Sequence, residues 1–118
     1  MGTFEVPLQV GDMLGRRFVE VNALVDTGST YTSIPSNLLV SLGIPVHSRR
    51  VFRIADESIV EYAIGEARVR LNQEELTVVV VFAPEDSSPL VGATTLELFS
   101  LGADPVNRQL VPVAPLMK

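Results

Sequence analysis

Five consecutive apolar residues, the "VVVVF" of residues 78–82, constrain the fold more than any other stretch of this sequence. A strand with one face in water alternates apolar and polar side chains, whereas a strand covered on both faces is apolar throughout. We therefore expect residues 78–82 to form a strand that is buried on both faces and lies centrally in a sheet. The chain has 118 residues, 47% of them apolar, which suits one domain with a modest core. We predict a single domain over residues 1–118, with residues 112–118 as a possible tail.

Most of the remaining sequence is typical of short strands joined by turns. Residues 3–10 and 17–25 flank "GDMLG", a polar and glycine-containing connection that suits a hairpin. Further along, "RRVFRIADESIVEYAIG" gives two strand-like runs around the turn "ADES", and "EARVRLNQEELTVVVVF" gives two more around "NQEE". Two antiparallel hairpins in succession are the simplest interpretation, so the sequence indicates an all-β fold.

Only two segments have a helical pattern. In "SNLLVSLGIPV", Ser36 is expected to cap a short helix that Gly43 ends. In "TTLELFSLGADPV", Thr94 and Glu97 have the spacing of a capping box, and Gly102 is expected to end the helix. Each segment follows apolar residues and a glycine, which indicates either one strand, turn and helix unit used twice or the common occurrence of Leu-Gly at helix ends.

The composition excludes several kinds of site. The sequence has no cysteine, so disulfides, cysteine nucleophiles and thiolate metal sites are all excluded. The single histidine, His47, cannot form a multi-histidine metal site, and we expect it in an exposed loop. The net charge of −5 argues against a nucleic-acid partner, which would be met by a basic face. We expect no metal and no cofactor.

The N-terminal residues "MGTFEVPLQVGD" lack the basic start and apolar core of a signal peptide. No apolar run approaches membrane-spanning length. We therefore expect a cytoplasmic protein without a membrane partner.

Few residues could carry catalytic chemistry. Ser29, His47 and several acids would formally allow a Ser-His-Asp arrangement, but no serine has the sequence context of a nucleophile elbow. No glycine-rich phosphate loop occurs. The acidic pairs fall in predicted turns, where solvent-facing charge is expected, and nothing supports a cation site there. These pairs are Asp56-Glu57, Glu74-Glu75 and Glu85-Asp86.

Asp26 is the remaining candidate. In "ALVDTGSTYTSIP" it follows an apolar, strand-like run, and Gly28 comes two residues later, where it permits a tight turn. A second segment of two apolar residues and a glycine, "LVG" at residues 90–92, lies far downstream. The triplet Asp-Thr-Gly is a weak signal alone, and this context strengthens it.

These motifs resemble those of the retroviral-type, or retropepsin-like, aspartic proteases and especially their small cellular relatives in prokaryotes. "ALVDTGSTYTSIP" is similar to the family's Asp-Thr-Gly signature, and "PLVGATTLELFSLGADP" is similar to the segment before its C-terminal helix. "VFRIADESIVEYAIG" falls where the family has its flap hairpin. The resemblance implies a closed or partly open β-barrel of hairpins with one or two short helices, functional as a symmetric homodimer.

The resemblance also implies an aspartic endopeptidase. Each chain would supply one Asp26 to a single site on the twofold axis, because one chain has one Asp-Thr-Gly. Two carboxylates that lie close together cannot both ionise easily, so the pair would share one proton. One carboxylate would activate a water molecule while its protonated partner donates to the scissile carbonyl of an extended peptide.

The family's roles then fall on named positions. Asp26, Thr27 and Gly28 would be catalytic, with the Thr27 hydroxyl in a hydrogen-bond lattice across the dimer axis. Ser29 would donate to the ionised carboxylate and favour an acidic optimum. Substrate would also contact the flap tip and the floor of the cleft. The positions are Ile54, Ala55, Asp56 and Glu57 at the flap tip, and Leu90 and Val91 in the floor.

The sequence departs from the viral pattern in three places. Ala93, Thr30 and Tyr31 replace the arginine and the acidic residues of an ion pair in viral enzymes, so the dimer must be held differently. The flap turn "ADES" has no glycine. Pro112 and Pro115 suit an edge strand or a tail.

Two alternatives to an active peptidase remain. One is a catalytically weak or inactive dimerisation or peptide-binding module with the same fold. The other is an unrelated β-barrel in which Asp26 only caps a turn.

Overall fold

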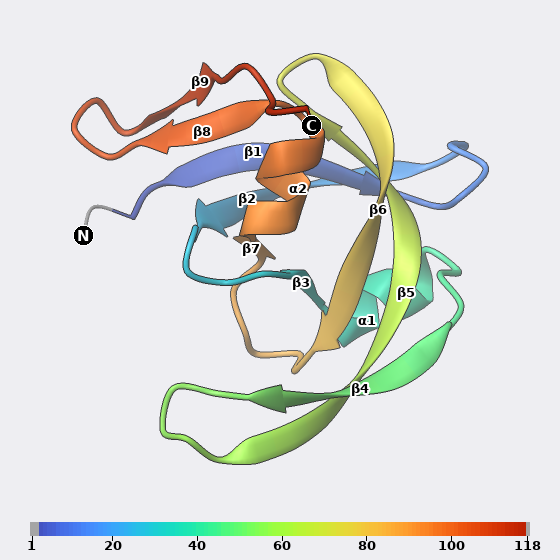
Figure 1. Cartoon of the computed structure of the whole chain (residues 1–118). Coiled ribbons are helices and arrows are strands. Elements are labelled where there is room, and N and C mark those ends of the chain that lie inside the picture. The colour runs from blue at the N-terminus through green and yellow to red at the C-terminus, as the bar shows by residue number, and fades with distance from the viewer. Residues whose placement is uncertain (1–2, 118) are drawn as a thin grey trace.

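The computed structural model describes residues 3–117 of the chain. The described chain has nine strands and two short helices (Figure 1). In chain order they are β1 (Glu5–Gly11), β2 (Phe18–Val25), β3 (Thr32–Pro35), α1 (Ser36–Ser41), β4 (Ser48–Arg53), β5 (Ile59–Leu71), β6 (Glu74–Ala83), β7 (Leu90–Val91), α2 (Ala93–Leu98), β8 (Leu101–Asp104) and β9 (Gln109–Pro112).

Seven strands form one sheet in the order β1-β2-β7-β3-β6-β5-β4. β1 also pairs with β5, so the sheet curls back on itself and encloses the core. Fully buried side chains from four different strands, including Leu8, Ile34, Val80 and Val91, fill this interior. The prediction of a mostly β fold with one or two short helices is therefore confirmed, and the sheet is partly closed.

The apolar run at residues 78–82 lies in β6, between β3 and β5 in the sheet. Val78, Val80, Val81 and Phe82 are all buried, which confirms a central strand covered on both faces. Val79 differs, because its side chain is 40% exposed and lines a surface hollow with Tyr31. The strand is thus open to solvent at one position.

The predicted hairpins are present, but two of the predicted strands are one. β5 runs without a break through Gly65 and pairs with β4 at one end and β6 at the other. The β5–β6 turn is Asn72 and Gln73 alone, both with positive φ, as in the tight turns of two-residue hairpins. Glu74 and Glu75 therefore begin β6, and their prediction as turn residues is wrong.

Both helices are present, but their predicted caps are mostly wrong. Ser36 is the first residue of α1 and Pro35 is its N-cap, without a side-chain cap hydrogen bond. Gly43 does follow the end of α1 with a positive φ of 74°, as expected of a left-handed C-terminal glycine. α2 has no capping box, and it ends before Gly102, which lies in β8.

The capping box fails because the amides at the start of α2 have other partners. The Ala93 and Thr94 amides donate to the carbonyls of Ser29 and Thr30, at 2.7 and 3.1 Å. Carbonyl groups from a loop far away in the sequence thus accept hydrogen bonds from amides that would otherwise need a side-chain cap.

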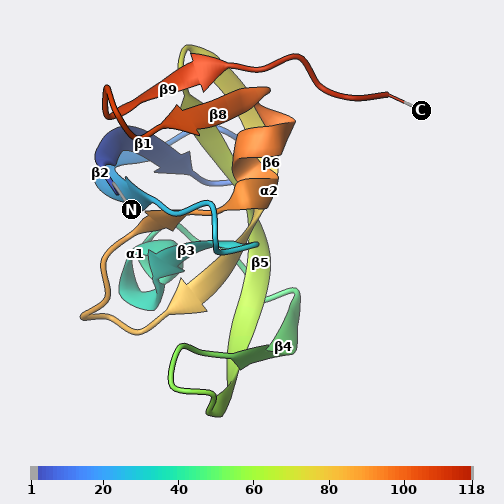
Figure 2. The same cartoon turned by 60° about the vertical axis from the view of Figure 1, so that its left-hand side comes forward.

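The C-terminal residues form a small second sheet, in which β8 pairs with β9. Both views place this hairpin beside β1, and Figure 2 shows the chain after β9 running away from the body. Pro112 is the last residue of β9 and lies in the outer strand of this small hairpin, which agrees with the edge strand that was one of its two predicted positions. Residues 113–117 have no regular secondary structure.

Candidate active site

Asp26 follows directly after the last residue of β2. β2 runs parallel to the two-residue strand β7, with Leu24 opposite Leu90 and Val25 opposite Val91. The Asp26 amide donates to the Val91 carbonyl at 3.0 Å, so the hydrogen bonding of this strand pair continues to the candidate residue. The two sequence segments singled out by their apolar residues and glycines therefore lie side by side.

The next residues form a tight loop around the Asp26 carboxylate. The Gly28 amide donates to Asp26 Oδ1 at 3.0 Å, and the Ser29 amide donates to the Asp26 carbonyl at 3.2 Å. Asp26 is half-buried, whereas Thr27 and Gly28 are exposed. The carboxylate thus has a defined orientation while the loop beside it remains accessible.

This loop borders an open depression of about 630 Å³. Its walls come from the N-terminal segment, the end of β2, the loop and the β8–β9 hairpin. The lining residues are Thr3, Phe4, Val25, Asp26, Thr27, Gly28, Ala103 and Pro105. Among these described lining residues Asp26 alone carries an ionisable side chain. The depression therefore contains one carboxylate in an otherwise neutral, largely apolar setting.

Gly92 holds the loop against the start of α2. A Cβ on Gly92 would lie 2.3 Å from the Tyr31 carbonyl oxygen, so only glycine allows this approach. The Gly92 amide donates to the buried Thr32 Oγ1 at 3.1 Å, and Thr32 Oγ1 lies 2.6 Å from Thr95 Oγ1. The loop that holds Asp26 and the "LVG" segment are thus packed together as one unit.

Two predicted contact residues lie differently from expectation. Val91 is fully buried, so its side chain supports the core and does not line an open face. The Ser29 hydroxyl donates to the Tyr31 carbonyl at 3.1 Å and not to the Asp26 carboxylate. The predicted bond from Ser29 to the Asp26 carboxylate is therefore not formed in the structure, because a backbone acceptor uses the only hydroxyl proton. Leu90 is half-buried beside the loop.

The predicted flap is the β4–β5 hairpin, which projects from the body in both views (Figures 1 and 2). Ile54, Ala55, Asp56 and Glu57 form its tip, and none of them lines the depression that contains Asp26. Hydrogen bonds from the Ser58 hydroxyl and amide hold the pKa of Asp56 below its usual value. One chain therefore does not bring the flap tip and Asp26 together in one pocket.

Sequence reasoning missed six residues around the loop. Thr3, Phe4, Val25, Ala103 and Pro105 line the depression, and Tyr31 contacts the flap. Val25 adjoins Asp26 in the sequence, but no local pattern marks the other four lining residues, because the N-terminal segment and the β8–β9 hairpin reach the site only through tertiary packing. Tyr31 carried a signal, since an aromatic residue five positions after Asp26 is unusual in a predicted turn rich in small residues.

Neither a metal site nor a membrane span is found in the residues described. No group of three or more His, Cys, Asp or Glu side chains within residues 3–117 could hold a metal ion. Likewise, neither helix of the described chain is long and apolar enough to cross a membrane. His47 is in an exposed loop, as predicted.

The aspartyl protease family model matches residues 6–104, and the chain belongs to this family. The match includes β1 through β8 and therefore both segments that form the candidate site. Among curated proteins, none matches the sequence.

Solved structures show the same fold. The retropepsin-like aspartic protease from Rickettsia conorii is 18% identical, with a TM-score of 0.57 and coverage of 92% of this chain and 80% of that one. The retroviral protease-like domain of Ddi1 from Leishmania major is 16% identical, with a TM-score of 0.60 and coverage of 98% and 96%. The simian foamy virus (mac) protease is 12% identical, with a TM-score of 0.59 and coverage of 80% and 93%. The fold is thus retropepsin-like.

Proposed function

We propose that this chain is an aspartic endopeptidase that works as a symmetric homodimer, with one Asp26 from each subunit. The observation that carries the proposal is the Asp26-Thr27-Gly28 loop, fixed at the junction of β2 and β7 with its carboxylate facing an open depression. Membership of the aspartyl protease family supports the same chemistry.

The need for a second chain follows from the number of carboxylates. Hydrolysis by an aspartic dyad uses two carboxyl groups that share one proton. The described lining of the depression supplies one, Asp26, beside an exposed Thr27 and Gly28. A twofold axis next to this loop would bring the second Asp26 into contact with the first and complete the site.

In this arrangement the ionised Asp26 acts as the general base for a water molecule. The protonated Asp26 of the other subunit donates to the scissile carbonyl, and the water attacks the carbon directly. The amide of Gly28 donates to Asp26 Oδ1, which leaves Oδ2 for the water or for the shared proton. No covalent intermediate with the enzyme forms.

Substrate would be an extended peptide that pairs with strands of the site and places alternate side chains in pockets. Leu90 and the flap tip, residues 54–57, are the proposed contacts. The Val91 side chain is not among them, because it is buried. We propose that residues 1–118 form one protease domain, with the segment after β9 as a tail.

Cleavage of a peptide library by the purified protein from acidic to neutral pH tests the proposal. Asp26→Asn is expected to abolish cleavage, because it removes the general base while keeping the size of the side chain. Glu20→Gln is the matched control, since it removes an exposed carboxylate from β2, the strand that leads to Asp26, and is expected to leave cleavage unchanged. Equal cleavage by the Asp26→Asn variant would contradict an aspartic mechanism.

The second candidate is a weak or inactive dimerisation or peptide-binding module. The flap tip favours it, because the turn from Ile54 to Ser58 contains no glycine and is braced by the Asp56 side chain. A stable dimer that binds peptides but cleaves none at any pH would favour this module over the peptidase. If the protein sediments strictly as a monomer at high concentration, a site shared between two chains is excluded for the peptidase and for the module alike.

A further inference from the structure

The flap and the loop after Asp26 meet through aromatic side chains. The rings of Tyr31 and Phe52 lie edge to face, with centroids 5.2 Å apart and an interplanar angle of 80°. Phe52 also contacts Tyr62 on the second flap strand, at 5.8 Å. Arg50 Nη1 donates to Tyr31 Oη at 2.8 Å. Tyr31 therefore makes both an aromatic contact and a hydrogen bond to β4.

These contacts attach β4, the outer strand of the flap, to the rest of the protein. In β4 only the side chains of Ser48 and Phe52 are half-buried, and the others are exposed. Phe52 is thus the residue near the flap tip that packs inward. Since β4 otherwise pairs only with β5, losing the Tyr31 contacts would leave the hairpin held at its base.

The other side of Tyr31 is fixed to the candidate site. Its carbonyl accepts a hydrogen bond from Ser29 Oγ, and a Cβ on Gly92 would lie 2.3 Å from the same oxygen. The Tyr31 backbone therefore moves with the loop that holds Asp26. The side chain then extends from this fixed backbone to the flap.

The flap tip is a poor place for bending. The Ile54 amide donates to the Ser58 carbonyl at 3.0 Å, and Asp56 Oδ1 accepts from both the amide and the hydroxyl of Ser58. Entry of a peptide under this hairpin would therefore require the flap to move as a unit. The contacts that such a movement breaks are those of Tyr31 with Phe52 and Arg50.

We propose that Tyr31 is a positioning residue that seats the flap on the loop bearing Asp26, so that flap opening means separation of Phe52 and Arg50 from Tyr31. The structural part of this proposal concerns the flap alone, and its kinetic consequence rests on the proposed peptidase function. If the seated flap is the form that binds peptide, weakening its contacts with Tyr31 raises KM by the factor by which the population of the seated form falls. It leaves kcat nearly unchanged.

The chain offers a direct optical test. It has two tyrosines and no tryptophan, and both tyrosines, Tyr31 and Tyr62, contact Phe52. All intrinsic tyrosine fluorescence therefore reports on this cluster. Phe52→Leu is expected to make the emission more accessible to a neutral quencher. Val51→Ala is the matched control, because that side chain is 63% exposed on the same strand, and it is expected to cause no change.

Hydrogen exchange and kinetics complete the test. Exchange of the flap amides at residues 48–61 is expected to rise about two- to tenfold in Phe52→Leu, as loss of the aromatic pair that joins the flap to Tyr31 predicts, and less in Tyr31→Phe, which loses only the Arg50 bond. Exchange in β8 and β9 should not change. KM for a cleaved peptide is expected to rise by at most the same factor, because KM follows the seated fraction whereas exchange follows the open fraction, with kcat within about twofold.

The two proposals fail in different ways. Unchanged quenching and flap exchange in both variants would overturn the seating role, whatever the activity. Faster flap exchange in a protein that never cleaves peptide would support the seat and count against the peptidase. A fall in kcat without a rise in KM would also overturn the positioning role, because it would indicate an effect on the chemical step.

Discussion

At the scale of single residues, Thr32 joins the two halves of the site. Its hydroxyl oxygen accepts from the Gly92 amide at 3.1 Å and lies 2.6 Å from Thr95 Oγ1, and both threonines are almost fully buried. Buried polar groups are stable only when their partners are present. One small side chain therefore fixes the distance between the Asp26 loop and the turn before α2.

Thr32→Val is expected to lower the free energy of unfolding by about 2 to 4 kcal/mol, because it keeps the shape and leaves both the Gly92 amide and the Thr95 hydroxyl without this partner. Urea denaturation measures the change. Thr77→Val is the control, since Thr77 Oγ1 accepts from Arg68 in a half-buried surface position, and it should change stability by under about 1 kcal/mol. Equal effects of the two substitutions would contradict the role of Thr32.

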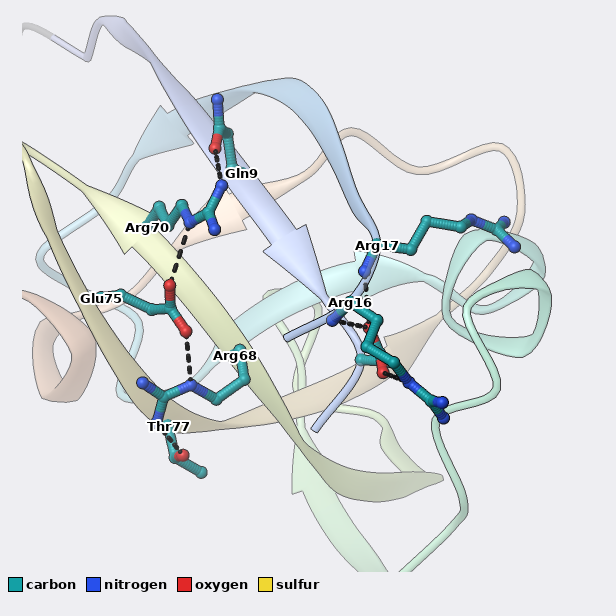
Figure 3. A network of polar contacts seen from close by, with 8 residues as sticks. Gln9, Arg16, Arg17, Arg68, Arg70, Glu75 and Thr77 are labelled. Carbon is teal, nitrogen blue, oxygen red and sulfur yellow. Dashed lines mark hydrogen bonds and ion pairs between the residues drawn. The ribbon is translucent and has the colours of Figure 1, made fainter. Parts of the chain in front are cut away.

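At the scale of elements, charged side chains reinforce the β5–β6 hairpin where it meets β1 (Figure 3). Glu75 lies between two arginines, with Arg68 Nε at 2.9 Å from Oε2 and Arg70 Nε at 3.0 Å from Oε1. Arg70 also donates to Gln9 on β1 and stacks over the Phe18 ring at 3.6 Å. The network joins the two strands at which the sheet curls back on itself.

Stability is expected to depend on pH through Glu75. Hydrogen bonds from Arg68 and then Arg70 hold the Glu75 pKa below its usual value. A lowered pKa in the folded state means that the stabilisation is complete at neutral pH and is lost as pH falls through the folded pKa. Glu75→Gln should therefore be less stable than the parent protein at pH 7, and the difference should shrink at acidic pH values, as the pH falls through the folded pKa of Glu75.

Thermal unfolding between these pH values measures the difference. Glu66→Gln is the control, because Glu66 is exposed on the neighbouring strand β5 and makes no ion pair with the residues described. A stability difference for Glu75→Gln that stays constant with pH would show that the ion pairs contribute nothing.

At the scale of the whole molecule, one chain presents a single carboxylate at the candidate site, whereas the proposed mechanism needs two. The depression beside Asp26 is open and contains no second carboxylate among its described lining, and the flap tip lies outside it. The N-terminal segment and the β8–β9 hairpin also contribute to this region, through Thr3 and Phe4 from the first and Ala103 and Pro105 from the second. A second copy is therefore expected to approach on this side.

Mixing subunits tests the shared site directly. If the dimer alone is active, adding an equal concentration of the Asp26→Asn variant to the parent protein should reduce cleavage to about half after subunits exchange, because half of the parent subunits then have an inactive partner. A ninefold excess should reduce it to about a tenth. An equal addition of the Glu20→Gln variant should instead about double the rate. Cleavage that the Asp26→Asn variant does not affect would show that each chain works alone.

Much of the fold could be predicted from local patterns. The apolar run in β6, the hairpin turns and the glycine after α1 are encoded by side-chain periodicity and by backbone conformations that few residues adopt. The same is true of the Asp26 loop, because an aspartate, a small residue and a glycine after an apolar strand favour a tight turn. Local sequence therefore specifies these features wherever the segment lies in the fold.

Other features depend on partners far away in the chain. The predicted capping box of α2 is absent, because the carbonyls of Ser29 and Thr30 already accept hydrogen bonds from the first amides of α2. Val91 is buried in the core for the same reason. Both outcomes arise from the parallel pairing of residues 24–25 with residues 90–91, which no local pattern contains. The bond from the Ser29 hydroxyl to the Tyr31 carbonyl differs, because its partners lie two positions apart.

By itself, the sequence determined the all-β class, the hairpin strands β1, β2, β4, β5 and β6, and the position of the single candidate carboxylate, because periodicity and turn chemistry act over a few residues. The tertiary structure alone decided that Gly92 packs against Tyr31, that Thr32 bonds across to α2 and that Tyr31 reaches Phe52 on the flap. These contacts join residues up to 63 positions apart. They form only when packing of the core brings those residues within hydrogen-bonding or van der Waals distance.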